Sequence, residues 1–315
     1  MNVMTVAWNI SLSTVVYAGY PDIHLNADEL LRHVVATGFR SIEVSAWNLL
    51  EDWPLKELVA RCKAAGISIP SVHCTHHYDL DVIGRDYHQK PIGDRDSEEV
   101  FREFHEEFYN DLEGAGLNQV IVVEHLPTLE KQLDFALNRL SVLREVNNQF
   151  SFVIATENMP GPPRDEQLCV LRKLLAEEGI AYCHDINHAA MASFEPFDFV
   201  EFLPKLRNVH VVGNNPLIRF GDGVPPGLGI VPIPQVLRKM IESGYSGPLT
   251  VEIYGFEREL DTVFRMGETA LTVVDPERGR QCGTALAGSD WRDIMAIYSR
   301  KYLERVIESK GDHYE

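Results

Sequence analysis

The stretch YCHDINHAAM at residues 182–191 places two histidines and an aspartate within five positions. His184, Asp185 and His188 follow the apolar residues GIA, which indicate the start of a buried strand. Burying an unpaired charge against such a strand is costly. Either these side chains satisfy one another, or a positive charge lies in front of them.

Other acids and histidines occupy the same kind of position, at or near the end of an apolar run. They are His73 in SVHC, Glu124 and His125 in VVEH, Glu157 in IATEN, His210 in NVHVV and Glu252 in LTVEIYG. If the runs are the parallel strands of one barrel, their carboxyl ends meet at one rim, where chemistry belongs. Acids gathered at that rim repel one another unless a cation holds them.

Four of these residues come from four consecutive predicted strands and form a candidate metal site: Glu157, Asp185, His210 and Glu252. Three carboxylates and one imidazole are a hard, oxygen-rich set that suits Mn²⁺, Mg²⁺, Co²⁺ or Zn²⁺. The pattern predicts one divalent ion bound by these four side chains. Simpler alternatives are that Glu157 and Asp185 cap the helices that follow them, and that His210 is a satisfied core histidine. Strand alternation points His184 to the opposite face, so we interpret His184 as structural.

A recurring junction predicts the elements that carry these residues. A helix-like segment ends in glycine, an apolar residue follows, and a strand-like run begins. The junction occurs in ATGFRSIEV (36–44), AAGISIPSV (64–72), GAGLNQVIVV (114–123), EEGIAYCHD (177–185) and ESGYSGPLTVEI (242–253). Three further strand candidates, MTVAWNISL (4–12), FSFVIATEN (150–158) and NVHVVGN (208–214), bring the number to eight. Amphipathic helical stretches lie between them at 27–38, 53–66, 129–146, 166–179 and 234–244.

Eight strands alternating with helices predict an α/β protein, a single (β/α)₈ TIM barrel with a C-terminal helical extension. A doubly wound open sheet is the alternative, but no GxGxxG follows the first strand and no GxxxxGK[ST] occurs. We assign residues 1–275 to the barrel and 276–315 to the extension, whose apolar stripe over 291–309 packs on the barrel or on a partner subunit of a homo-oligomer. Residues 75–95 lengthen the loop after the third strand and are a candidate lid.

The charge, the apolar runs and the cysteines of the sequence disfavour several classes of protein. The 315 residues include 47 acidic and 29 basic side chains, a net charge of −18 that disfavours nucleic acid as a partner. The sequence shows neither an apolar run long enough to span a membrane nor the start of a signal peptide. Five scattered cysteines, never spaced CxxC, argue against a disulfide framework and a thiolate zinc site. These features predict a cytoplasmic protein that binds no membrane.

With these residues in hand, the chain resembles the superfamily of xylose isomerase-like barrels, which includes sugar isomerases, sugar epimerases, inosose dehydratases and apurinic-site endonucleases. The resemblance covers roughly residues 4–260. Its motifs are TEN at 156–158, HDINH at 184–188, VHVVGN at 209–214, PPGLG at 225–229 and VEIYG at 251–255. Their order and spacing along one barrel make the resemblance specific.

The resemblance implies roles for individual residues. In the single-metal sugar enzymes the matching positions bind one divalent ion, here Glu157, Asp185, His210 and Glu252, and the two glutamates also act as general acid and base. His188, and an arginine in the loop after strand seven, here Arg219, bind substrate hydroxyls. The endonucleases use further ligands for three metal ions, and His73, His125 and His188 match some of them. In FGDGVPPGLG, Gly223 stands where those enzymes have histidine, so a full trinuclear site is not expected.

The expected chemistry is proton transfer next to the carbonyl of a keto-sugar or related polyol, with His73, His125 and Trp8 as further substrate-binding residues. Trp8, Trp47 and Tyr254 are candidates for apolar walls around the sugar. Two bases on opposite faces give epimerisation, one base along the carbon chain gives isomerisation, and protonation of a β-hydroxyl gives dehydration. An endonuclease and a non-catalytic sugar-binding barrel are the remaining alternatives.

Overall fold

The computed structural model describes residues 9–18, 26–45, 54–74, 93, 96–214, 222–253 and 291–309. Eight parallel strands close into a barrel in the order β1-β10-β7-β6-β5-β4-β3-β2. They are β1 (Ile10–Ser13), β2 (Ser41–Ser45), β3 (Ser68–Cys74), β4 (Ile121–Glu124), β5 (Val153–Glu157), β6 (Ile180–Asp185), β7 (Leu206–Val211) and β10 (Leu249–Val251). The predicted (β/α)₈ barrel with a C-terminal helix is confirmed, and the open sheet is excluded because β1 pairs with both β2 and β10.

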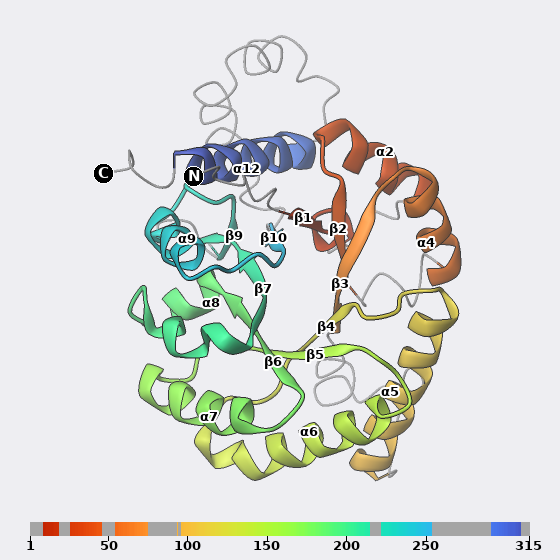
Figure 1. Ribbon diagram of the computed structural model, residues 1–315, viewed down its shortest axis with the longest axis vertical. Coiled ribbons are helices and arrows are strands. Elements are labelled where there is room, and N and C mark those ends of the chain that lie inside the picture. Colours follow the sequence, from red (N-terminus) through yellow and green to blue (C-terminus); the bar gives the residue numbers. More distant parts are fainter. Residues whose placement is uncertain are drawn as a thin grey trace.

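Helices surround the barrel, as Figure 1 shows. They are α1 (Val15–Ala18), α2 (Ala27–Thr37), α4 (Leu55–Ala64), α5 (Ser97–Gly114), α6 (Leu133–Asn147), α7 (Arg164–Ala176), α8 (Ile186–Met191), α9 (Ile233–Glu242) and α12 (Trp291–Glu308), with 3₁₀ turns η2 (Glu130–Gln132) and η3 (Asp198–Lys205). Two short strands, β8 (Gly213–Asn214) and β9 (Asp222–Val224), form an antiparallel pair after β7. None of the described helices is long and apolar enough to cross a membrane.

The predicted helix-to-strand junctions have the backbone geometry that glycine permits. Gly38, Gly66, Gly116, Gly179 and Gly244 all have positive φ, between 67° and 85°. At the first of them the Gly38 amide donates to carbonyls in the last turn of α2. An L-residue is disfavoured in this conformation, so the glycine ends the helix and turns the chain into the strand.

The first strand and one long helix differ from the sequence prediction. The first strand was expected over 4–12, whereas β1 spans Ile10–Ser13, and residues 4–8 lie outside the described part. Helix α5 was not among the predicted helices. Its N-cap, Asp96, accepts hydrogen bonds from the Glu98 and Glu99 amides, and it buries three phenylalanines, Phe101, Phe104 and Phe108, against the barrel. Charged residues between these aromatics weakened its pattern in the sequence.

The side chains inside the barrel are apolar on some strands and polar on others. Val123, Ala155, Ala181 and Cys183 form a small apolar cluster on β4, β5 and β6. The strands on the other side contribute fully buried polar residues instead: Ser11, Ser13, Glu43, Ser71, Asn208 and Thr250. Parallel-strand partners point to the same side of the sheet, so the register places Ser71 beside Glu43, and Thr250 beside His210, inside the barrel.

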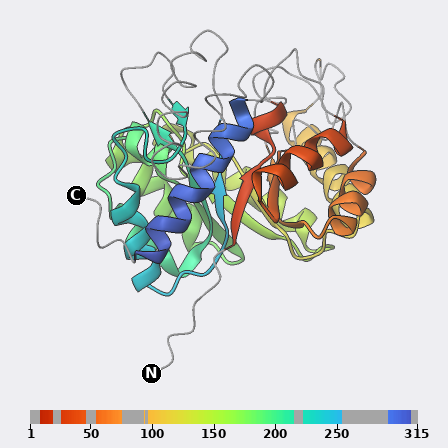
Figure 2. The same cartoon turned by 90° about the horizontal axis from the view of Figure 1, so that it is seen from above.

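Helix α12 lies against α2, α9, β1 and β10 (Figure 1; Figure 2). Its Met295, Ala296 and Leu303 side chains are fully buried in this single chain. The apolar stripe predicted over 291–309 therefore packs largely on its own barrel. The proposed boundary at residue 275 falls outside the described residues, as do Trp8, Trp47, Arg219, Tyr254 and nearly all of the candidate lid at 75–95.

Candidate active site

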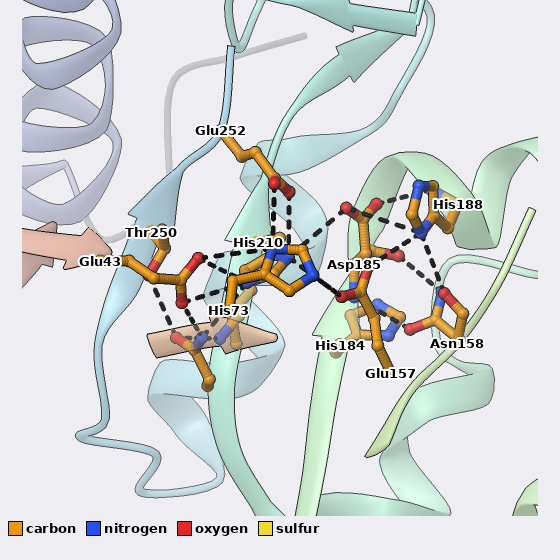
Figure 3. A network of polar contacts seen from close by, with 12 residues as sticks. Glu43, His73, Glu157, Asn158, His184, Asp185, His188, His210, Thr250 and Glu252 are labelled. Carbon is orange, nitrogen blue, oxygen red and sulfur yellow. Dashed lines mark hydrogen bonds and ion pairs between the residues drawn. The ribbon is translucent and has the colours of Figure 1, made fainter. Parts of the chain in front are cut away.

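The four residues predicted as metal ligands converge at the carboxyl ends of the strands. Nδ1 of His210 lies 3.0 Å from Glu252 Oε2, 3.4 Å from Glu157 Oε2 and 3.8 Å from Asp185 Oδ2. The sheet register explains this, because Asp185 pairs with His210 across β6 and β7, and His210 pairs with Thr250, two residues before Glu252. Figure 3 shows Glu252 extending towards His210 with Asp185 and Glu157 beside it.

The two carboxylate oxygens of Asp185 have different surroundings. It is the N-cap of α8, and its Oδ1 accepts a hydrogen bond of 2.6 Å from the His188 amide. Its Oδ2 makes no hydrogen bond and faces His210. One oxygen therefore starts the helix, and the other remains available to the site.

The donor atoms of this cluster suit a divalent cation. All four side chains are at most 8% exposed. His210 Nδ1 makes no hydrogen bond although three carboxylate oxygens lie around it, and Asp185 Oδ2 makes none either. Ligands bound at about 2.0–2.2 Å to one ion are separated by about 3–3.6 Å. The distances from His210 Nδ1 to Glu252 and Glu157, 3.0 Å and 3.4 Å, lie in that range, and the distance to Asp185, 3.8 Å, is slightly longer. A cation at this point would satisfy the unpaired atoms and remove the repulsion among the acids.

Three further histidines predicted at the rim also reach the site. Nε2 of His73 and Nε2 of His125 are 2.6 Å apart, and they lie 3.4 Å and 3.2 Å from Glu157 Oε2. His73 Nδ1 lies 3.2 Å from Glu252 Oε1. His188 Nδ1 lies 2.9 Å from Glu157 Oε1 and 3.0 Å from the Asn158 carbonyl. His73, His125 and Glu157 thus form a second group of donors that could hold a cation.

The field of the clustered acids favours positive charge. Burial alone would lower the pKa of His188, but Asp185 and Glu157 raise it to about 9. Burial raises the pKa of Asp185 to about 6, against the opposing effect of His188. For Glu157 and Glu252 burial would also raise the pKa, but the neighbouring histidines hold both values below the ordinary range for glutamate. His125 differs, because burial lowers its pKa despite Glu157.

Two residues at or next to the strand ends face away from the site. His184 donates or accepts at Nδ1 with the Tyr182 hydroxyl, 2.8 Å away, and its ring packs against Phe199, as expected for a structural residue. Glu124 turns towards α5, where its Oε1 lies 3.3 Å from His105 Nε2 and accepts a 3.4 Å hydrogen bond from the Tyr109 hydroxyl. Glu124 therefore belongs to the interface between β4 and α5.

The sequence analysis missed Glu43. This fully buried residue lies inside the barrel on β2, and its Oε1 is 3.1 Å from His210 Nε2. The search for strand-end residues passed over it because Glu43 is the third of five residues in its strand. The available signal was its place in SIEVS, an acid flanked at two-residue spacing by two serines on the same face.

Fold and site together define an α/β-barrel protein with carboxylates and histidines gathered at the carboxyl ends of its strands. Residues 31–269 match the family described as xylose isomerase-like TIM barrel, and the chain belongs to this family. A comparison with curated protein sequences finds no match.

Solved structures with the same fold have low sequence identity to this chain. L-ribulose 3-epimerase is 13% identical with a TM-score of 0.65, covering 96% of this chain and 95% of its own. D-allulose 3-epimerase from Methylomonas sp. is 13% identical with a TM-score of 0.62, covering 96% and 100%. The IolI protein, determined with a zinc atom, is 11% identical with a TM-score of 0.63, covering 96% and 98%. At these identities the similarity establishes the fold.

Proposed function

We propose that this protein is a divalent-metal-dependent isomerase or epimerase that moves a proton next to the carbonyl of a keto-sugar or related polyol. The observation that carries the proposal is the buried His210 Nδ1, which makes no hydrogen bond among Glu157, Asp185 and Glu252. The metal ligands in this proposal are these four residues. The family membership, two relatives named as epimerases and the zinc atom in IolI support it.

Glu157 and Glu252 are the proposed catalytic residues. Their lowered pKa values keep both carboxylates ionised near neutral pH and therefore able to accept a proton. A bound divalent ion would supply Lewis acidity that polarises the substrate carbonyl. One glutamate takes the proton from the adjacent carbon, and the electron pair of that C–H bond moves towards the carbonyl. Return of a proton to the opposite face of the same carbon gives epimerisation, and return to the former carbonyl carbon gives isomerisation.

The histidines are proposed to bind and orient the substrate. His188 has a raised pKa and can donate to a hydroxyl oxygen, whereas His125 has a lowered pKa and can accept a hydrogen bond when neutral. Arg219 and Trp8 are proposed as further substrate contacts. A carbohydrate complex of a structurally similar protein, D-allulose 3-epimerase with D-allulose, supports this class of substrate. The charge of −18 disfavours nucleic acid.

Deuterium exchange tests the proposal directly. The purified protein is incubated with ketohexoses or inososes in heavy water, with each divalent metal supplied in turn. Metal-dependent entry of deuterium beside the carbonyl supports proton transfer, whichever product accumulates. Loss of water from an inosose without isomerisation would favour a dehydratase on the same site. Absence of exchange with every substrate and metal would contradict the proposal.

A further inference from the structure

Inside the barrel, Oε2 of Glu43 accepts hydrogen bonds from side chains of β3 and β7, whereas its buried Oε1 makes none. The Ser71 hydroxyl donates to Glu43 Oε2 at 2.7 Å, and Asn208 Nδ2 donates to the same oxygen at 2.7 Å. The Asn208 amide is held in this orientation because its Oδ1 accepts from the Thr250 hydroxyl at 3.1 Å and from the Val209 amide at 3.0 Å. Figure 3 shows Glu43 and Thr250 on the side of His210 away from Asp185 and Glu157.

These partners determine which atom of His210 carries a hydrogen. Serine and amide donors both point at Glu43, so its carboxylate acts as an acceptor. His210 Nε2 lies 3.1 Å from Oε1 and 3.3 Å from Oε2 of that carboxylate. Asn208 Nδ2 also lies 3.3 Å from Nε2, but its shorter contact is the 2.7 Å hydrogen bond to Glu43 Oε2. We assign the hydrogen to Nε2, because a lone pair directed at two carboxylate oxygens is repulsive. In the neutral ring the lone pair is then on Nδ1, the atom surrounded by Glu157, Asp185 and Glu252.

We propose that Glu43 is a positioning residue that holds His210 in the tautomer and ring orientation that present Nδ1 to the divalent ion. This inference rests on the proposed function, because it assigns a role towards the same metal. A histidine ligand is commonly fixed by a carboxylate on its other nitrogen, which also makes it a better donor. Ser71 and Asn208 hold Glu43, Thr250 holds Asn208, and so four strands contribute to the placement of one imidazole.

A purely structural role and a positioning role for Glu43 predict different effects of substitution on zinc affinity. In the Glu43→Gln variant the shape is kept, and the Ser71 hydroxyl and Asn208 amide can still donate to the remaining side-chain oxygen. The new amide group then faces His210 Nε2 and donates to it, which moves the ring proton to Nδ1 and removes the metal-binding lone pair. If Glu43 only filled space inside the barrel, Glu43→Gln would leave zinc affinity unchanged.

The test measures zinc affinity by chelator competition and identifies the metal-bound nitrogen of His210 by ¹⁵N NMR of the zinc-loaded protein. The expected result for wild type is zinc on Nδ1 and a proton on Nε2. We expect Glu43→Gln to weaken zinc binding by about 10- to 100-fold, and Glu43→Asp, which keeps the carboxylate, to recover part of the loss. The control is Glu113→Gln, the same change at an exposed glutamate on α5, with zinc affinity expected to be unchanged.

The outcomes separate this inference from the proposed function. Zinc bound through Nε2 overturns the inference even if Glu43→Gln fails to fold, because that result needs only the wild-type protein. Equal affinities of Glu43→Gln and Glu113→Gln overturn it as well. If wild type binds no divalent ion, the proposed function fails first. If zinc binds through Nδ1 and Glu43→Gln weakens it, the inference stands whether or not any sugar undergoes exchange.

Discussion

Asp185 and His210 are partners across the ladder of β6 and β7, and this pairing directs Oδ2 of Asp185 towards Nδ1 of His210, 3.8 Å away. Asp185 Oδ1 meanwhile accepts a hydrogen bond from the His188 amide in the first turn of α8. The same residue thus ends a strand, starts a helix and supplies an oxygen to the site. A side chain held by its helix in this way loses little freedom when a cation binds.

Two substitutions of Asp185 distinguish the helix cap made by one oxygen from the metal binding proposed for the other. Asp185→Asn keeps an oxygen that can cap α8 but brings an amide to the metal side, so we expect a large loss of metal affinity with helix α8 intact. Asp185→Ala removes both functions and should be less stable than Asp185→Asn by about 1 kcal/mol in the metal-free state. Urea unfolding in chelator and zinc titration measure the two effects. Equal stability of the two variants would show that the cap contributes nothing.

Glu252→Gln tests the proposed base. Glu252 Oε2 lies nearest His210 Nδ1, and Oε1 contacts His73, so an amide keeps the shape but cannot accept the substrate proton. We expect deuterium exchange to fall by about 10²- to 10⁴-fold at saturating metal, with the melting temperature of the protein little changed. Glu113→Gln, at an exposed position on α5, is the control. Full exchange in Glu252→Gln would rule out Glu252 as the catalytic base.

Loading with metal should stabilise the folded state. Binding to the folded chain alone adds about 2.7 kcal/mol when free metal is 100 times its dissociation constant. We therefore expect chelation to lower the melting temperature and readdition of Mn²⁺, Co²⁺ or Zn²⁺ to restore it. Elemental analysis should find one ion per chain.

The group of His73, His125 and Glu157 could hold an additional ion, which elemental analysis would detect as a second ion per chain. Two ions per chain in wild type, reduced to one in His125→Ala, would show that this second group also binds metal. One ion in both proteins would leave His73 and His125 with substrate binding alone.

Residues at the ends of strands were accessible to sequence reasoning because two local signals coincide there. An apolar run marks each strand, and for Asp185 and Glu252 a glycine before the run also marks its start. These two residues and Glu157 could therefore be placed on one rim without coordinates. Helix α5 was less accessible, since its buried aromatic residues alternate with charged ones.

Glu43 could not be assigned to the site in this way. The role of Glu43 depends on its contacts with Asn208 and His210. These residues are 165 and 167 positions away in the chain and contact Glu43 only when the barrel closes. The direction of Glu124 was also hidden, because a one-residue shift in where a strand ends sends a side chain to the opposite face. Strand-end position predicts a place on the rim, whereas the facing direction follows from register.

The ion pair of Arg164 and Asp198 gives a prediction for stability against pH away from the metal site. Arg164 Nε donates to Asp198 Oδ2 at 2.6 Å and Nη2 donates to Oδ1 at 2.7 Å, which joins α7 to η3. These hydrogen bonds hold the pKa of Asp198 below its ordinary value, against a smaller opposing effect of burial. A lowered pKa in the folded state means that the unfolded chain binds the proton more tightly. The contribution to stability is therefore present above the unfolded pKa of about 3.9 and is lost as pH falls through the lower folded value.

We accordingly expect Asp198→Asn to reduce the free energy of unfolding by about 1 kcal/mol at pH 7, a modest figure because water screens the partly exposed guanidinium. The difference from wild type should shrink as pH falls below about 4, where the unfolded chain begins to take up the proton. Glu201→Gln is the control, because the pair of Arg172 and Glu201 has similar geometry but more exposed side chains, 54% and 39% against 36% and 12%. Its effect should be smaller at every pH. Urea unfolding from pH 3 to pH 7 makes the comparison, and a difference for Asp198→Asn that stays constant down to pH 3 would show that its effect does not come from the ion pair.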